Sequence, residues 1–408
     1  MPKSLLKYFP SFIILIPLGE IISKTLPGKL PQAYNYIVYI MFGITCLLYY
    51  CNNFKRIHKD NKFLSWIYIY IIAYIIVGFI KQYFVPSGLF PFFRLSISMA
   101  LLSLGSIFIF RYENYLIKRT FHLWWKYIPI IFILTFWKLE ASQYIRLLSF
   151  SLFFLMLFPL LKTKYKIIII IMIAFIMIGG MEQRIDYINI TTSFLLLIII
   201  KYAKRFSQPF FTILFRGLML IPLFFVTLFW VKGFNILQLN QFIDDETQLA
   251  GQLNDDTRSF LYEEAWASGI NNKNLIHGRT PFYGYDSNFA ENREGDAFLR
   301  KGQKAQRVSE VFIVNTLAWF GIIGIIIFFL FYYKIGMKTL SRTQNPYLSV
   351  FTIYIGFFWF ESWIGNLLFM PNTSYILLCM IISMCHNPRL NKMETNEMKL
   401  YLANLSNS

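Results

Sequence analysis

Six arginines are the residues of this chain best suited to chemistry, because a guanidinium can hold phosphate oxygens through two parallel hydrogen bonds. In chain order they are Arg94, Arg146, Arg184, Arg258, Arg279 and Arg307. Any one of them taken alone could be a snorkelling or ion-paired structural residue. Six brought to one face would repel one another unless carboxylates or a bound anion compensated them, which favours a phosphate-bearing ligand.

Two further side chains could move a proton near these arginines. Glu310 follows Arg307 closely and is our first candidate for a general base, although the pair could equally be a structural salt bridge. His277 is the second candidate, and the alternative for it is an ordinary solvated histidine. The chain has no Gly-rich phosphate loop, no paired His/Cys spacing and no nucleophilic serine elbow. We therefore expect neither a metal nor a cofactor.

Long apolar segments must position these residues. Of the 408 residues, 56% are hydrophobic and 15% are charged, which leaves too few polar groups to cover a soluble domain of this size. Apolar runs of about 17–22 residues recur from end to end, and this length crosses a bilayer core. The sequence predicts an all-α, polytopic integral membrane protein with about twelve transmembrane helices. They are expected near 9–23, 34–51, 63–80, 89–110, 122–137, 143–161, 165–181, 188–203, 210–231, 311–333, 347–361 and 366–386.

The net charge of +18 would suggest a nucleic-acid partner in a soluble protein, but its distribution favours a membrane topology. Lysines and arginines gather in alternate short loops, at 55–62, 111–119, 162–166, 201–205, 334–342 and 389–399. The opposite short loops carry few. By the positive-inside rule we predict that both termini are cytoplasmic and that the polar stretch 232–310 is outside. We expect no nucleic-acid partner.

The polar stretch 232–310 divides the chain. We predict about nine transmembrane helices in 1–231, a large extracytoplasmic loop in 232–310, about three helices in 311–386 and a cytoplasmic tail in 387–408. The loop holds 12 of the 21 acidic residues. We expect in it a surface helix at 235–253, a second helix at 255–269 ending at Gly269, and an exposed segment at 286–306. Turns are expected at Gly278, Pro281 and Gly284. This topology brings all six arginines to the outer side.

Three groups of short motifs follow one another along the chain, each with an arginine. Met-Glu-Gln-Arg at 181–184 places an arginine at the outer mouth of a helix. Thr-Arg-Ser at 257–259, with its arginine before Gly269 in an Arg-x10-Gly spacing, is followed by His-Gly-Arg-Thr-Pro-Phe-Tyr-Gly at 277–284. Arg-Val-Ser-Glu at 307–310 leads to Gly-Ile-Ile-Gly at 321–324, where the loop re-enters the membrane. Together with the architecture, these stretches resemble the O-antigen polymerase and O-antigen ligase superfamily of bacterial envelope enzymes.

The resemblance implies a metal-independent glycosyltransferase of the bacterial inner membrane. Such an enzyme moves a glycan from a polyprenyl diphosphate, such as undecaprenyl diphosphate, to a sugar hydroxyl, and preorganised arginines stabilise the leaving diphosphate. The arginines implied to bind the diphosphate are Arg184, Arg258, Arg279, Arg307, Arg94 and Arg146. Glu310, His277 and Arg258 form the implied catalytic group. The implied partners are a lipid-linked oligosaccharide donor and acceptor, membrane lipid, a chain-length regulator and a flippase.

Several functions are compatible with these residues. The first is a polymerase that extends a surface polysaccharide (O-antigen, capsule or exopolysaccharide) with a second lipid-linked repeat as acceptor. A ligase acting on a lipid or protein acceptor is the near alternative, but ligases typically carry a histidine at the re-entry and 307–310 has none. A lipid-oligosaccharide transporter would favour charges near the midplane, internal repeats and short loops. A non-catalytic scaffold of an assembly complex is a third alternative.

Overall fold

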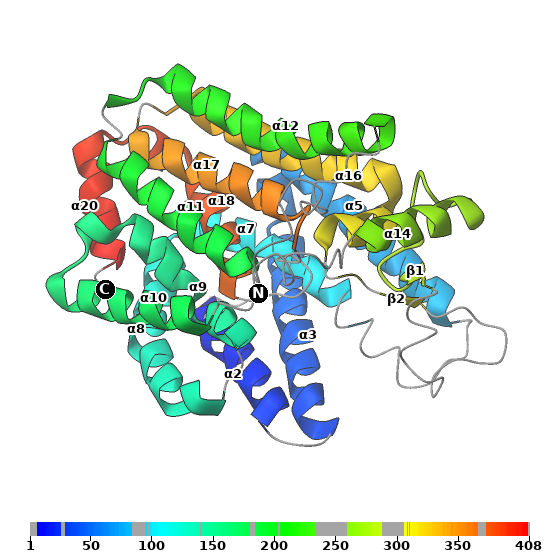
Figure 1. The fold of residues 1–408 in the computed structure, drawn as a ribbon, viewed down its shortest axis with the longest axis horizontal. Coiled ribbons are helices and arrows are strands. Elements are labelled where there is room, and N and C mark those ends of the chain that lie inside the picture. Colours follow the sequence, from blue (N-terminus) through cyan, green and yellow to red (C-terminus); the bar gives the residue numbers. More distant parts are fainter. Residues whose placement is uncertain are drawn as a thin grey trace, which may run out of the picture.

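The structure is a computed structural model that describes residues 6–25, 29–83, 95, 98–138, 141–179, 184–202, 205–232, 259–287, 306–307, 309, 311–343, 345–365 and 373–406. Apart from one short pair of strands, the described chain is helical (Figure 1). The first helices are α2 (Phe12–Thr25), α3 (Lys29–Asn52), α4 (Phe54–Asp60), α5 (Lys62–Tyr83), α7 (Ser106–Tyr112), α8 (Tyr115–Thr135), α9 (Ala141–Met156), α10 (Thr163–Gly179), α11 (Arg184–Lys201) and α12 (Gln208–Lys232). They are followed by α14 (Ser259–Asn271), β1 (Tyr285–Asp286), β2 (Gln306–Arg307), α16 (Phe312–Leu340), α17 (Pro346–Glu361), α18 (Thr373–Cys385), α19 (Pro388–Asn391) and α20 (Thr395–Ser406). Short 3-10 turns are η1 (Phe9–Ser11), η2 (Ser103–Gly105), η3 (Phe136–Lys138) and η4 (Phe158–Leu160).

Every predicted span coincides with helix in the described chain, so the all-α prediction is confirmed. Among the described residues, three segments are long and apolar enough to cross a membrane: Ala33–Asn52, Lys62–Lys81 and Phe312–Leu340. Shorter apolar helices accompany them, for example Ser98–Tyr112, Gln208–Phe224 and Thr373–Cys385. Large apolar side chains also point outward from the peripheral helices α10 and α12, as a lipid-facing surface requires. These features indicate a multi-pass membrane protein, while the number of crossings stays a prediction.

Two C-terminal helices form the centre of the bundle. All residues of α18 are buried, and almost all of those of α17 are too. A helix that is apolar around its whole circumference is buried on every side. In agreement, α17 packs against α12, α16 and α18, while α18 also packs against α7 and α9 (Figure 1). The segments on either side of the polar stretch 232–310 therefore share one core.

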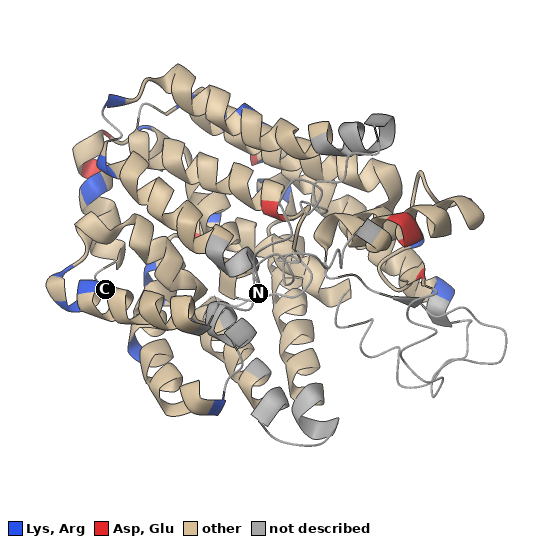
Figure 2. Cartoon of the chain, in the orientation of Figure 1, with Lys and Arg blue, Asp and Glu red and all other residues tan. Residues whose placement is uncertain are grey.

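The turns of the bundle assemble into two separate ends. At one end, which we call the basic end, the Tyr112 hydroxyl donates to Asp60 at 2.8 Å and Asn345 Nδ2 donates to the Met393 carbonyl at 3.3 Å. Most lysines and arginines of the described chain lie toward this end, which also holds α20 and the C-terminus (Figure 2). At the other end, the loop end, α14 packs against α16 and β1. The predicted alternation of basic and non-basic turns thus corresponds to two ends of one bundle.

The loop differs from its prediction at two points and lies partly outside the described residues. The segment predicted to be exposed at 286–306 begins with Asp286, whose side chain is half-buried, and with the buried Ser287. The second predicted helix is present as α14, but Gly269 does not end it, because the helix continues to Asn271. The left-handed residue after the helix is Lys273, with φ 57°, and the Asn274 amide donates to the Gly269 carbonyl at 2.8 Å. The predicted surface helix at 235–253 and most of the segment 286–306 lie outside the described residues.

Candidate functional site

The loop end is built around a break in helix α16. Gly321 has φ 67° and ψ −165°, so the α-helix stops at Phe320 and resumes at Ile322. The segment that follows α14 takes the place of the missing helical bonds. The amides of Arg279 and Thr280 donate to the carbonyls of Ala318 and Trp319 at 2.8 and 2.9 Å. The amides of Ile322 and Ile323 donate in return to the carbonyls of Leu275 and Ile276 at 3.0 and 3.1 Å. Irregular backbone at a membrane helix is tolerated where protein satisfies its polar groups, as it does here.

Two glycines make this close backbone contact possible. A Cβ added to Gly321 would lie 2.2 Å from the Ile276 carbonyl oxygen, and one added to Gly278 would lie 2.4 Å from the Phe320 amide nitrogen. Both residues also have positive φ, which disfavours any side chain. The predicted turn at Gly278 is therefore present. The backbone that it contacts, at Trp319 and Phe320, directly precedes the first glycine of the Gly-Ile-Ile-Gly stretch, a contact that the sequence alone did not reveal.

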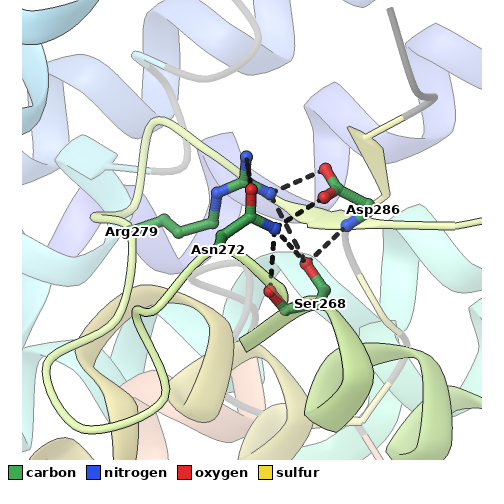
Figure 3. A network of polar contacts seen from close by, with 4 residues as sticks. All are labelled: Ser268, Asn272, Arg279 and Asp286. Atoms are coloured by element: carbon green, nitrogen blue, oxygen red, sulfur yellow. Dashed lines mark hydrogen bonds and ion pairs between the residues drawn. The ribbon is translucent and has the colours of Figure 1, made fainter. Parts of the chain in front are cut away.

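Arg279, which is fixed by this junction, belongs to a closed polar network (Figure 3). Its Nη1 donates to Asp286 Oδ1 at 2.7 Å, and the side chains of the pair are only 18% and 17% exposed. Asn272 Nδ2 donates to the other Asp286 oxygen at 2.7 Å, and the Asp286 amide donates to Ser268 Oγ at 3.0 Å. The network ties the C-terminal part of α14 to β1. It gives Arg279 a structural ion pair, and its role as a diphosphate ligand stays a prediction.

His277 lies at the same junction. Its carbonyl accepts the Tyr74 hydroxyl of α5 at 2.9 Å, which ties the turn to the N-terminal half of the bundle. The side chain is exposed, and in the part of the chain that the structure describes its imidazole makes no hydrogen bond. A general base works best when a partner orients its ring. The geometry therefore gives His277 access to solvent but no orienting group among the described residues.

The re-entry into α16 is pinned to the end of α17. The Ser309 amide donates to Asn315 Oδ1 at 2.7 Å, and Asn315 Nδ2 donates back to the Ser309 carbonyl at 2.8 Å. The first amides of α16, at Phe312 and Ile313, donate to carbonyls of the 361–365 segment. The orphan donors of the helix start are thereby satisfied. This clasp fixes where Ser309 and Val311 enter the bundle.

Glu361, at the end of α17, is a buried carboxylate. It is 2% exposed, and Asn189 Nδ2 of α11 donates to its Oε1 at 2.9 Å. An ionisable side chain buried in a membrane helix marks a functional region by default, because its insertion is costly. The sequence does not reveal this hydrogen bond, because Asn189 and Glu361 are 172 residues apart.

The structure brings together the elements that carry several of the predicted residues. Helix α11, which begins at Arg184, packs against α9, which carries Arg146, and against α17. Strand β2 pairs antiparallel with β1, so that Arg307 faces Tyr285 beside the Arg279 network. The side chains of Arg146, Arg184 and Arg307 lie outside the described part, as do the residues Arg94, Arg258 and Glu310.

Within the described residues, no group of His, Cys, Asp and Glu side chains is large enough to hold a metal ion. Comparison with known proteins adds no further constraint: no protein-family model, no curated protein and no solved structure matches this chain. The function must therefore be argued from the residues themselves.

Proposed function

We propose that this protein is a membrane glycosyltransferase that polymerises polyprenyl-diphosphate-linked oligosaccharide repeats into a surface polysaccharide. The observation that carries the proposal is the junction between 275–280 and the broken helix α16. It anchors an arginine-bearing turn at the loop end, where α11 begins with Arg184 and where Ser309 adjoins the re-entry. Anion-binding side chains and a candidate base would thus surround one mouth of the bundle.

The proposed topology has about twelve transmembrane helices, cytoplasmic termini and an extracytoplasmic loop. Its support is the separation of charge, because most lysines and arginines of the described chain lie toward the basic end (Figure 2). The loop end would then face the side on which lipid-linked repeats are assembled into long chains. Such a donor keeps its polyprenyl tail in the bilayer and presents its diphosphate at the membrane surface.

In the proposed reaction the acceptor hydroxyl oxygen attacks the anomeric carbon of the donor sugar. The bond between that carbon and the diphosphate oxygen breaks, and the lipid diphosphate leaves with the bonding electrons. The hydroxyl proton passes to Glu310, or to His277 as the second choice. Arg184 and Arg258 stabilise the negative charge that develops on the leaving group. Arg279, already paired with Asp286 at 2.7 Å, mainly holds the turn in place.

The arrangement supports an enzyme better than a transporter. Transporters bind substrate near the midplane, between repeated halves of the bundle. Here the buried carboxylate Glu361 is at the end of α17, and the Arg279 network lies on α14 and β1, both at the loop end. The ligase alternative shares the donor site and differs in its acceptor. The re-entry residues 307–310, which contain no histidine, favour the polymerase.

The first experiment tests the diphosphate ligands in cells that lack the native gene. Arg184→Ala and Arg258→Ala should abolish long-chain glycan while single repeats stay on the lipid carrier, and Arg184→Lys should restore little, because lysine lacks the bidentate fork. Arg216→Ala is the matched control, since Arg216 is exposed on α12 and should be dispensable. Normal chain lengths in both alanine variants, at equal protein levels, would refute the site.

A second experiment separates polymerase from ligase. The purified full-length protein is placed in liposomes with one lipid-linked repeat and no other acceptor. A polymerase produces carrier-linked dimers and longer chains, whereas a ligase leaves the repeat unchanged until a lipid or protein acceptor is added. Transport without any new glycosidic bond would favour the transporter.

A further inference from the structure

The basic end holds a cluster of cations that the proposed reaction does not use. Arg111 lies in the last turn of α7, Lys338 lies in the last turn of α16, and Arg342 follows that helix. All three interact electrostatically with His386, which directly follows α18. Among the described residues none of the three forms an ion pair with a carboxylate. Three cations therefore share one small region, and the carboxylate that acts on Arg111, Asp60, does so without a direct ion pair.

Hydrogen bonds between the helices hold this cluster together. Thr339 Oγ1, next to Lys338, donates to the Cys385 carbonyl at 3.1 Å. One turn before Arg111, the Ile107 carbonyl accepts the Ser383 hydroxyl at 2.8 Å. The ends of α7, α16 and α18 are thus fixed side by side.

His386 adds no charge to the cluster. Asn61 accepts the Leu64 amide with its side-chain oxygen, so its Nδ2 faces His386 Nε2 and donates to it. Nε2 is then the unprotonated nitrogen of a neutral imidazole. In accord with this, burial and the neighbouring Arg111, Lys338 and Arg342 lower the pKa of His386 to about 3.

The helix dipole accounts for the position of Arg111 but not for its burial. Arg111 complements the dipole at the C-terminus of α7, as Lys338 and Arg342 do for α16. A snorkelling arginine, however, keeps its head group in water, whereas Arg111 Nη1 is buried and has no hydrogen-bond partner. The carboxylate that acts on it most, Asp60, is exposed and accepts the Tyr112 hydroxyl at 2.8 Å. A buried guanidinium nitrogen without a partner is costly unless a ligand completes it.

We propose that Arg111, Lys338 and Arg342 form a binding site for a phosphate group at the basic end. The ligand chemistry is an anionic phosphate whose oxygens accept from the Arg111 fork and from the two flanking cations. Basic pockets between membrane helices on the cytoplasmic side of a membrane bind lipid head groups. A soluble phosphate offers the same oxygens. The site lies at the end opposite the Arg279 network and does not depend on the proposed transferase activity.

The test uses the full-length protein in neutral detergent, stripped of lipid. Its unfolding midpoint is followed during titration with dioleoylphosphatidylglycerol, with dioleoylphosphatidylcholine, and with sodium phosphate against sodium chloride at equal ionic strength. A ligand that binds only the folded state raises the midpoint in a saturable way. We expect phosphatidylglycerol or phosphate to do so, and phosphatidylcholine and chloride to have no effect. Stabilisation by phosphatidylglycerol alone identifies a lipid head group, and stabilisation by phosphate alone identifies a soluble ligand.

Arg111→Gln and Arg342→Gln should each weaken the apparent affinity about tenfold or more, the loss of one charge-assisted contact. Arg342 is exposed, so its variant folds even where Arg111→Gln does not. The matched control is Lys55→Gln with Lys399→Gln, two exposed cations at the same end that lie outside the cluster. The proposal is overturned if neither ligand stabilises the wild type, or if the control loses the response as fully as Arg342→Gln does.

Discussion

Gly278 and Gly321 are the residues on which the loop end depends most. Each has positive φ and contacts the backbone of the other segment, so a methyl group at either position has no room. Gly321→Ala should lower the free energy of unfolding by at least about 1–2 kcal/mol, the cost of the left-handed conformation, with the clash in addition. Gly217→Ala is the control, because nothing lies within 4 Å of a Cβ there. Alanine at that helical position should be neutral or stabilising by up to about 1 kcal/mol. Thermal unfolding of the purified variants measures both, and equal midpoints would contradict the junction.

His386 should make stability depend on pH. Its pKa is lowered from 6.5 to about 3 in the fold, so between these values the unfolded chain binds a proton that the folded chain does not. The stabilisation is complete above the unfolded pKa and is lost as pH falls toward the folded value, by at most about 1.4 kcal/mol per pH unit. His386→Gln keeps an acceptor for Asn61 but cannot titrate, so its unfolding midpoint should fall less between about pH 7 and pH 5. The exposed His122→Gln should keep the wild-type slope.

At the residue scale, the sequence could identify chemistry but not partners. Arg279 was predicted as a phosphate ligand, and its neighbour Asp286 was visible as one acid among many in the loop. Their pairing depends on β1 folding back onto α14, which no local pattern encodes. The contact of Glu361 with Asn189 likewise joins two helices that are distant in the sequence. Long-range contacts of this kind follow from the fold and not from spacing.

Helices, in contrast, were predictable because apolar runs of membrane length leave the backbone no other way to satisfy its hydrogen bonds. The predicted spans coincide with helices, and errors concern boundaries, as at Gly269 within α14. The break in α16 was not predictable from composition, since Gly321 lies within the predicted span at 311–333 and the residues around it, Phe320 and Ile322, are apolar. A glycine in a membrane helix is common, and the close contact with the backbone of Ile276 and His277 gives this one its role.

The predicted C-terminal tail forms the helices α19 and α20, and α20 packs against the bundle. Truncating one buried leucine of α20 should show that this packing stabilises the protein. In α20, Met398, Leu402 and Leu405 are buried, and the Trp125 indole of α8 donates to the Ser406 carbonyl at 2.9 Å. Leu402→Ala should destabilise the protein by about 2–5 kcal/mol through the cavity that it leaves. Leu400→Ala removes a side chain on the same helix that is 66% exposed and should change little. Unfolding midpoints that do not differ between the two variants would show that α20 is not docked.

At the scale of the whole molecule, the bundle has two chemically different ends. At the loop end, two hydrogen bonds tie the loop segments to the bundle. The Tyr74 hydroxyl donates to the His277 carbonyl, and the Tyr262 hydroxyl donates to the Trp363 carbonyl. The turns that meet at the other end are rich in lysine and arginine (Figure 2). Charge along the sequence predicted this division, because the positive-inside rule acts on each short loop separately. Which end faces the cytoplasm is a prediction of that rule, and the proposed reaction depends on it.

Cysteine labelling decides the orientation with one change at each end. Of the four cysteines only Cys51 is exposed, so Cys51→Ser gives a background with little reactivity. Ile276→Cys, at a position 63% exposed beside the Gly321 break, should react with a membrane-impermeant maleimide in intact spheroplasts. Leu400→Cys, at a position 66% exposed on α20, should react only after lysis. The reverse pattern would place the loop end in the cytoplasm and remove the basis for the proposed polymerase. The phosphate site at the basic end would survive that result, because it rests on Arg111 and its neighbours rather than on orientation.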